Sequence, residues 1–322
     1  MPKSTRILVT GAAGQIGSEL VLALCDRYGA DRIVASDIKP LSFPHPGPFE
    51  YVDVTEKPAL DAVVDRHQIN VVFHLAAILS AVGEQRPNLC WRVNVDGLHN
   101  VLDVAREREL TRVFCPSSIA VFGCRTPRNN TPQETVLDPA TMYGITKVSG
   151  ELLCRYYWQK HGLDVRGIRY PGLISSRTLP GGGTTDYAVA IYYEAIAKKR
   201  YSCFLAEKTI LPMMYMPDAI KATLNLMEAD STRLKHRVDF NLAAMSFSAG
   251  ELAAEIKKHI PDFVVDYKPD YRQAIADTWP CTIDDGAARQ EWGWNPDFDL
   301  ATMTVDMLKK LGRRHAEGTL YF

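Results

Sequence analysis

The strongest constraint on the fold is a short apolar segment, residues 6–10, that leads directly into three regularly spaced glycines. Apolar runs of this length are typical of a buried parallel strand. Gly11 permits a tight turn, Gly14 lets the backbone approach a pyrophosphate, and Gly17 lets a helix pack closely on the strand. Residues 18–25 continue in a helical pattern. The sequence therefore predicts a strand, a glycine turn and a helix whose N-terminus favours a bound phosphate.

A second predicted strand, residues 32–37, ends in an acid twenty residues after Gly17. In dinucleotide-binding folds an acid at this position binds the ribose of the cofactor. The Asp37 carboxylate can accept hydrogen bonds from both ribose hydroxyls of NAD, whereas it repels the additional phosphate of NADP unless an arginine compensates. NAD is therefore the predicted cofactor. Lys39 lies nearby in sequence, and its positive charge weakens this preference for NAD over NADP. The alternative role for Asp37 is that it simply caps a loop.

Strand-like and helix-like segments alternate through the first half of the chain. Residues 70–77 and 112–118 are strand-like, and residues 90–106 between them have a helical pattern. This alternation is typical of an α/β fold, here a Rossmann-type doubly wound parallel sheet covered by helices. Ligands bind beyond the carboxyl ends of the strands in such sheets, so the residues that follow each strand are candidate site residues.

The expected organisation is a cofactor domain followed by a smaller region for the substrate. We place the NAD-binding Rossmann domain at residues 1–171 and a smaller C-terminal substrate-binding region at residues 172–322. Residues 237–242 have the pattern of a strand, and we expect this segment to return to the main sheet. The boundary between the two parts is therefore not expected to be a clean one.

Tyr143 and Lys147 are the candidate catalytic pair. Four residues apart on a helix, their side chains lie on one face, where an ammonium favours the ionised form of a neighbouring phenol. Tyr143 is then a candidate general base. The alternative is an ordinary amphipathic helix that carries an exposed tyrosine and an exposed lysine.

The helix that carries this pair has predicted ends and a predicted partner. Asp138 is the expected N-cap, Pro139 suits the first helical position, and Gly162 suits a left-handed stop. Ser118, at the end of a predicted strand, is the candidate third member of the site, because its hydroxyl could bond the reacting oxygen. Ser117 competes for this role, since spacing does not separate adjacent serines and either could satisfy local backbone instead.

A glycine run in the second half of the chain is the candidate substrate loop. Residues 181–183 are glycines whose backbone amides could bind a carboxylate, while Thr184, Thr185 and Asp186 could hold hydroxyl and ammonium groups. Such a loop suits a small zwitterion. The alternative is a flexible hinge in which Thr184 or Thr185 caps the helix that begins near Tyr187.

Composition excludes several classes of partner. The chain has 322 residues, 46% of them hydrophobic, and a formal net charge of -1. A nearly neutral chain without a dense basic run has no electrostatic footprint for nucleic acid or for an anionic membrane surface. No segment approaches the roughly 18 to 20 apolar residues of a membrane span, and no leader precedes the first strand. We expect a soluble protein of the cytoplasm or the mitochondrial matrix.

The cysteines do not form a metal or redox motif. Seven are scattered singly through the chain, and no pair has Cys-x-x-Cys spacing. Zinc sites need clustered ligands, so we predict no metal. The thiols are expected to be small buried hydrophobes in a reducing compartment.

Several motifs together resemble the extended short-chain dehydrogenases of the NAD-dependent epimerase/dehydratase superfamily. The motifs are the glycine turn, His74-Leu-Ala-Ala77, Asn94 with its neighbours, Ser117-Ser-Ile-Ala-Val-Phe-Gly123 and Tyr143-x-x-x-Lys147. The resemblance implies catalysis by Tyr143, Lys147 and Ser118, with Ser117 beside the cofactor. The cofactor-binding residues that it implies are Gly11, Gly14, Gln15, Ile16, Gly17, Asp37, Asp53, Leu75, Ala76, Ala77, Asn94, Ser117, Tyr143, Lys147 and Tyr170.

Two segments resemble a narrower family, the L-threonine 3-dehydrogenases of the short-chain type. These are residues 170–188 and 275–280; residues 283–294 resemble an element found more widely in the superfamily. The resemblance implies oxidation of L-threonine to 2-amino-3-oxobutyrate with hydride transfer to NAD, and a homodimer formed by the helices around Asn94 and Tyr143. The substrate-binding residues that it implies are Ser80, Ser118, Tyr143, Gly182, Thr184 and Thr185.

Two other functions remain open from the sequence. A UDP-sugar 4-epimerase or dehydratase would use the same three catalytic residues, but Phe122 stands where sugar epimerases commonly have tyrosine. A cofactor sensor without chemistry would be expected to have lost Tyr143 or Lys147, and both are present. Formation of NADH with L-threonine, L-serine or UDP-sugars separates these functions.

Overall fold

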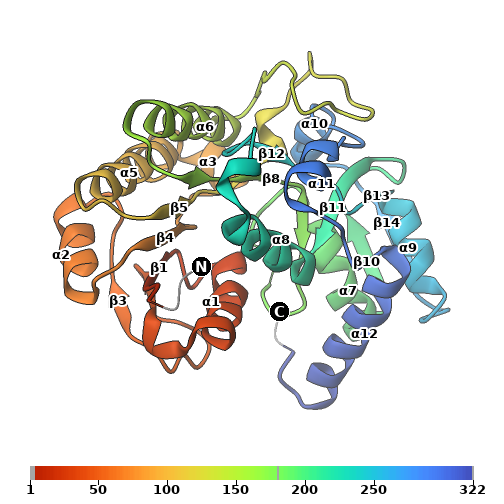
Figure 1. Ribbon diagram of the computed structural model, residues 1–322. Helices are drawn as coiled ribbons and strands as arrows, with labels where there is room; N and C mark the ends of the chain where they lie inside the picture. Colours follow the sequence, from red (N-terminus) through yellow and green to blue (C-terminus); the bar gives the residue numbers. More distant parts are fainter. Residues whose placement is uncertain (1–3, 180, 321–322) are drawn as a thin grey trace.

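A parallel sheet forms the centre of the first half of the computed structural model, which describes residues 4–179 and 181–320 (Figure 1). Its strand order is β3-β2-β1-β4-β5-β7. The strands are β1 (Ile7–Thr10), β2 (Ile33–Asp37), β3 (Phe49–Tyr51), β4 (Val71–His74), β5 (Arg112–Phe114) and β7 (Val165–Arg166). Leu8 pairs with Val34 of β2 and with Val72 of β4. The order, which runs outward from β1 in both directions, confirms the Rossmann-type doubly wound fold.

Helices cover both faces of this sheet (Figure 1). The helices are α1 (Gln15–Tyr28) and α8 (Met216–Glu228) on one face, and α2 (Lys57–His67), α5 (Gly97–Glu107) and α6 (Met142–His161) on the other. Successive residues of a strand point to opposite faces. Ile7 and Val9 accordingly pack in the core under α1 and α8, whereas Leu8 packs in the core under the other three helices.

The predicted strand at residues 112–118 is divided into two. β5 stops at Phe114, and β6 (Ser117–Ser118) pairs with β8 (Ile168–Tyr170) in a separate three-stranded sheet that also contains β12 (Phe240–Asn241). Pro116 explains the break, because proline has no backbone N–H to donate to a sheet. Both serines therefore lie on a strand of this second sheet. The segment at 237–242, expected to return to the main sheet, contains β12, which pairs with β8 and with no strand of the six-stranded sheet.

The long helix predicted at residues 90–106 contains an irregular turn. α3 (Ser80–Gln85) and α4 (Pro87–Trp91) come first, a π-helical turn covers Arg92–Asp96, and α5 follows. Turns of this kind are uncommon and occur frequently at functional sites. Asn94, one of the predicted site residues, lies at the middle of this π-helical turn.

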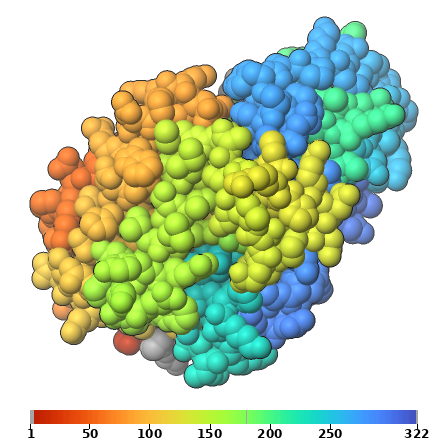
Figure 2. Space-filling view, turned by 90° about the horizontal axis from the view of Figure 1, so that it is seen from above, coloured from red at the N-terminus to blue at the C-terminus, as the bar shows by residue number. Residues whose placement is uncertain are grey.

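The C-terminal part packs beside the sheet around a core of its own. Its remaining strands are β9 (Gly172–Ile174), β10 (Arg200–Cys203), β11 (Ile210–Tyr215), β13 (Met245–Ser248) and β14 (Val264–Tyr267). Its remaining helices are α7 (Tyr187–Lys198), α9 (Ala249–Lys257), α10 (Tyr271–Ala276), α11 (Gly286–Trp292) and α12 (Leu300–Ala316). Thr131 bridges to Ile283, and the yellow residues around it lie against the later segments in Figure 2. The chain thus crosses more than once between its two parts.

Candidate active site

The glycine turn has the backbone conformation that only glycine tolerates there. α1 begins at Gln15, directly after Gly14, and Gly11 has a φ of +71°. A Cβ atom on Gly11 would lie 2.5 Å from the backbone nitrogen of Ala76, and one on Gly17 would lie 2.3 Å from the carbonyl oxygen of Gly11. Because the obstructing atoms belong to the backbone, neither position accepts a side chain without displacing the chain.

A cavity of about 220 Å³ opens where the glycine turn, the end of β4, β6 and α6 meet. Most of the predicted site residues line it. Those from the cofactor and catalytic sets are Gly11, Gly14, Gln15, Ile16, Gly17, Leu75, Ala77, Ser117, Ser118, Tyr143, Lys147 and Tyr170. Those from the substrate set are Ser80, Ser118, Tyr143, Thr184 and Thr185. The cavity lies beyond the carboxyl ends of β1 and β4, as expected for a doubly wound sheet.

Asp37 and Asp53 do not line this cavity. Asp37 accepts a hydrogen bond from the backbone amide of Ala13 at 2.9 Å, so the end of β2 is tied to the glycine turn. It also accepts one from the amide of Lys39 at 3.1 Å. Asp53 accepts hydrogen bonds from the amide and hydroxyl of Thr55 at 2.9 and 2.8 Å. Asp37 is thus next to the phosphate-binding turn, while Asp53 organises its own loop.

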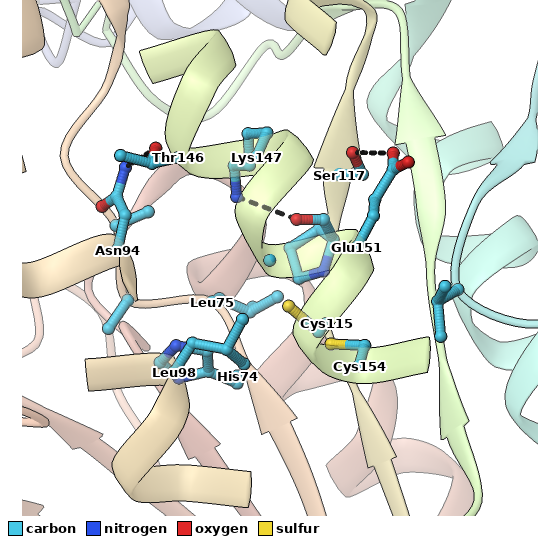
Figure 3. A pocket seen from close by; sticks show the side chains of 15 residues that line it. His74, Leu75, Asn94, Leu98, Cys115, Ser117, Thr146, Lys147, Glu151 and Cys154 are labelled. Carbon is cyan, nitrogen blue, oxygen red and sulfur yellow. Dashed lines mark hydrogen bonds between the residues drawn. The ribbon is translucent and has the colours of Figure 1, made fainter. Parts of the chain in front are cut away.

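Ala76 and Asn94 line a smaller neighbouring cavity of about 20 Å³ (Figure 3). The Asn94 side chain is buried and fully engaged. Its Oδ1 accepts a hydrogen bond from the amide of Ile78 at 2.8 Å, and its Nδ2 donates to the carbonyl of Ile78 and the hydroxyl of Thr146, both at 3.0 Å. Asn94 therefore ties the segment after β4 to α6, the helix that carries Tyr143 and Lys147.

The predicted N-cap of α6 is wrong. The cap is Thr141, whose hydroxyl accepts a hydrogen bond from the amide of Gly144 at 3.1 Å. The Asp138 carboxylate instead binds the Arg125 guanidinium at 2.8 and 2.9 Å, so it is not available to the helix. Gly162 ends the helix with a φ of +68°, as predicted.

The backbone of α6 packs directly on the turn that follows Ser118. A Cβ atom on Gly144 would lie 2.2 Å from the carbonyl oxygen of Ala120. The absence of a side chain at Gly144 therefore allows the first turn of the helix to approach the main chain next to Ser118. This contact brings the helix that carries Tyr143 and Lys147 to the strand that carries the serines.

Lys147 is held by the main chain of the neighbouring segment (Figure 3). Its Nζ donates a hydrogen bond to the carbonyl oxygen of Pro116 at 2.8 Å and lies 5.5 Å from the centroid of the Tyr143 ring. The same ammonium, together with complete burial, affects His74. Burial is the larger cause, and the two lower the pKa of His74 to about 3, so that the ring is neutral in the folded protein.

The structure separates the two serines that spacing alone left equivalent. The Ser117 hydroxyl donates to Oε1 of buried Glu151 at 2.5 Å, and Glu151 in turn binds the Arg169 guanidinium through both oxygens at 2.8 Å. The Ser118 hydroxyl accepts a hydrogen bond from the amide of Ala120 at 3.2 Å. Within residues 4–179 and 181–320 this hydroxyl donates no hydrogen bond, and Ser118 lines the cavity.

The glycine loop is arranged differently from the prediction. The amides of Gly182 and Gly183 donate to Oδ2 of Asp186 at 2.8 and 2.7 Å. The expectation that they are free for a ligand carboxylate is therefore wrong, because a carboxylate at the start of α7 already accepts them. Burial raises the pKa of Asp186 above its ordinary value, although these amides act in the opposite direction. Gly182 does not line the cavity, whereas Gly183 does.

The Thr184 hydroxyl is the polar group that this loop leaves unsatisfied. Its side chain is buried, and it has no hydrogen-bond partner in the part of the chain that the structure describes. A buried polar group without a partner costs free energy, which a ligand can recover by bonding to it. Trp279 lines the same cavity and was not predicted as a site residue. The one signal in the sequence was that it belongs to the resembling segment at residues 275–280.

These residues fit a bound dinucleotide. Gln15, at the start of α1, has a buried Nε2 donor without a partner among the described residues, and it lies beside the phosphate-binding turn. The free amides at the N-terminus of α1 also favour a bound phosphate. Over the same described ranges, no group of three His, Cys, Asp or Glu side chains is placed to hold a metal ion, and no helix is both long and apolar enough to span a membrane.

Comparison with known proteins places this site in a family. Residues 7–243 match the model of the NAD dependent epimerase/dehydratase family. An uncharacterized epimerase/dehydratase of Staphylococcus haemolyticus is 52% identical over 310 residues, which are 95% of this chain and 97% of that protein.

Two solved structures are similar over almost their whole length. A GalE-like L-threonine dehydrogenase from Cupriavidus necator, in its holo form, has a TM-score of 0.94 and 52% identity, with 95% of this chain and 99% of that chain covered. A monomeric L-threonine 3-dehydrogenase from a metagenome has a TM-score of 0.93 and 54% identity, with the same coverage. The cofactor of this protein is NAD, and the chain belongs to the NAD-dependent epimerase/dehydratase family of enzymes.

Proposed function

We propose that this protein oxidises L-threonine to 2-amino-3-oxobutyrate with NAD as the hydride acceptor. The observation that carries the proposal is one cavity lined by Tyr143, Lys147 and Ser118, by the glycine turn, and by the hydroxyl-bearing loop at residues 184–185. The similarity to two solved L-threonine dehydrogenases, at 52% and 54% identity, supports it.

Tyr143 is the proposed general base. As the phenolate, Tyr143 would take the proton of the substrate hydroxyl, and the positive charge of Lys147 on the next turn of α6 would stabilise that anion. The hydrogen bond from Lys147 to the Pro116 carbonyl holds the ammonium 5.5 Å from the Tyr143 ring centroid. A fixed ammonium stabilises a developing negative charge without reorganising during the reaction.

Ser118 is the proposed hydrogen-bond donor to the reacting oxygen. Its proton has no recorded acceptor among the described residues, whereas the proton of Ser117 is directed to Glu151. A donor that is not already engaged by the protein is available to the reacting oxygen as its charge changes. This difference supports the assignment of catalysis to Ser118 and of a supporting position to Ser117.

The glycine turn and the segment around Leu75 to Ala77 would hold the cofactor. The amides at the start of α1 would bind the pyrophosphate, and Gln15 and Asp37 lie within or beside that turn. Bound NAD supplies the acceptor for the hydride that leaves the carbinol carbon. The uncharged His74 below the site adds no charge at neutral pH.

The proposed substrate end of the cavity contains Ser80, Thr184 and Thr185. The unsatisfied hydroxyl of Thr184 suits a ligand with several polar groups. Asp186 stands in the same lining, and its carboxylate could receive an ammonium once the loop is occupied. Trp279 lines the same cavity, and its apolar ring could contact the methyl group of threonine.

The test is NADH formation with purified protein. We expect an absorbance increase with L-threonine, a slower one with L-serine and none with UDP-sugars. Tyr143→Phe should reduce kcat by about 10²- to 10⁴-fold with little change in NAD affinity. Near wild-type turnover in Tyr143→Phe, or activity confined to UDP-sugars, would contradict the proposal.

We also propose that the chain divides into a cofactor part, residues 1–171, and a substrate part, residues 172–322.

We further propose that the protein forms a homodimer. Leu152 and Tyr156 of α6 are large apolar side chains that are 57% and 51% exposed. A second copy of α6 could cover them. A solved relative is monomeric, so sedimentation equilibrium decides the matter. A monomer at every concentration up to that of the assay would reject the dimer.

A further inference from the structure

Two successive turns of α6 contact two successive residues of the segment that carries Ser118. Lys147 donates to the carbonyl of Pro116 at 2.8 Å, and Glu151, four residues later, accepts from the hydroxyl of Ser117 at 2.5 Å. Figure 3 shows both contacts side by side in the small cavity next to the site. Ser117 thus stands between the residue that holds Lys147 and the proposed catalytic Ser118.

We propose that Glu151 is a positioning residue that acts through Ser117. By fixing the Ser117 hydroxyl, it sets the orientation of the peptide groups on either side. The Pro116 carbonyl is thereby directed at Lys147, and the Ser118 hydroxyl is directed into the cavity. The inference rests on the proposed function of Lys147 and Ser118 and adds the group that keeps them in register.

Glu151 is itself held rigidly enough for this role. Its two oxygens bind Nε and Nη2 of Arg169, each at 2.8 Å, and both side chains are 3% exposed. Arg169 also donates to Oδ1 of Asn241 and to the carbonyl of Gln133, both at 3.2 Å. A carboxylate fixed by a bidentate ion pair has little freedom to turn. The serine hydroxyl that reaches it is therefore fixed as well.

A purely structural role for Glu151 makes a different prediction. If Glu151 only neutralised buried Arg169, then the Ser117 hydroxyl would be dispensable, since the ion pair uses both carboxylate oxygens without it. Ser117→Ala removes the contact in question and leaves the two buried charges paired. Ser36→Ala is a matched control, because Ser36 is buried on β2 and its hydroxyl donates to the carbonyl of Val9 at 3.2 Å, away from the catalytic residues.

The experiment measures three quantities in wild type, Ser117→Ala and Ser36→Ala. They are kcat and KM for L-threonine oxidation, the melting temperature, and the ¹H–¹⁵N signal of the Lys147 ammonium in protein labelled with [¹⁵N]lysine. Loss of that signal in Lys147→Arg assigns it. We expect Ser117→Ala to lower kcat by about 10- to 100-fold, as for a small misplacement of a catalytic group, with KM changed less than threefold.

The ammonium signal separates this inference from the proposed function. We expect it to shift or broaden in Ser117→Ala and to stay in place in Ser36→Ala, with similar melting temperatures in the two variants. Should wild type fail to oxidise L-threonine, the proposed function fails and the ammonium signal still decides the inference. An unchanged signal in Ser117→Ala, or equal losses of kcat in both variants, overturns the positioning role.

Discussion

The glycine turn allows strain and steric obstruction to be measured separately. Gly11 and Gly162 have nearly the same left-handed backbone, with φ values of +71° and +68°. A Cβ atom on Gly11 would lie 2.5 Å from the nitrogen of Ala76 and 2.7 Å from the carbonyl carbon of Leu75, whereas one on Gly162 would meet no atom within 4 Å. Alanine at either position therefore adds a similar backbone strain, but only alanine at Gly11 also collides with neighbouring atoms.

The expected magnitudes follow from this comparison. An alanine in the left-handed region costs roughly 1–2 kcal/mol, and a narrower unfolded ensemble returns about 0.4–1 kcal/mol in both variants. Gly162→Ala should therefore lower the free energy of unfolding by about 1 kcal/mol. Gly11→Ala should lower it by a further 1–3 kcal/mol or so, the usual cost of forcing extra atoms into a packed site.

Urea denaturation and NAD titration test both parts. We expect Gly162→Ala to bind NAD as the wild type does, because its site lies at the far end of α6. Gly11→Ala should raise the Kd for NAD by about tenfold or more, since the displaced backbone includes the phosphate-binding turn. Equal stabilities of the two variants, with unchanged NAD affinity in Gly11→Ala, would refute the assignment of the turn.

Three further predictions concern buried polar groups. The pKa of His74 is lowered to about 3 in the folded protein, whereas an unfolded histidine has a pKa of about 6.5. Between these two pH values the unfolded chain binds one more proton than the folded protein, so the free energy of unfolding falls as the pH falls through that window. His74→Gln should flatten this part of the pH profile of stability, measured by urea denaturation. Thr184→Val should raise KM for L-threonine severalfold in steady-state assays without loss of unfolding free energy, because the hydroxyl has no partner among the described residues; an unchanged KM would remove Thr184 from the substrate site. Glu151→Gln should lower the free energy of unfolding by about 3–5 kcal/mol in urea, because it breaks the buried bidentate ion pair and leaves Arg169 with the more distant carboxylate of Asp239, at 3.8 Å; a loss below 1 kcal/mol would contradict this account.

Local patterns predicted those features of the fold that depend on neighbouring residues. The strand at residues 7–10, the turn at Gly11 and the helix after it were predicted because their periodicity and glycine spacing are contained in one short segment, although the helix begins at Gln15, before the expected range of 18–25. The stop of α6 at Gly162 was readable for the same reason. The break at Pro116 was also signalled locally, although the predicted strand ran through it.

Contacts between distant segments decided what the sequence left open. Spacing made Ser117 and Ser118 equivalent, and in the structure the approach of Glu151 from α6 distinguishes them. Asp138 is a good capping residue by type, but Arg125 binds it, and Thr141 caps the helix instead. Such competition between partners depends on tertiary packing, which propensity alone does not describe.

The close approach of Gly144 to Ala120 has a consequence for how such an enzyme can change its specificity. At this point α6 and the turn after Ser118 approach each other main chain to main chain, which fixes the distance between the two elements that carry the catalytic residues. The residues at the substrate end, Thr184 and Trp279, come from separate segments that take no part in that contact. Exchange of those side chains can therefore alter which alcohol enters while the reacting geometry stays the same.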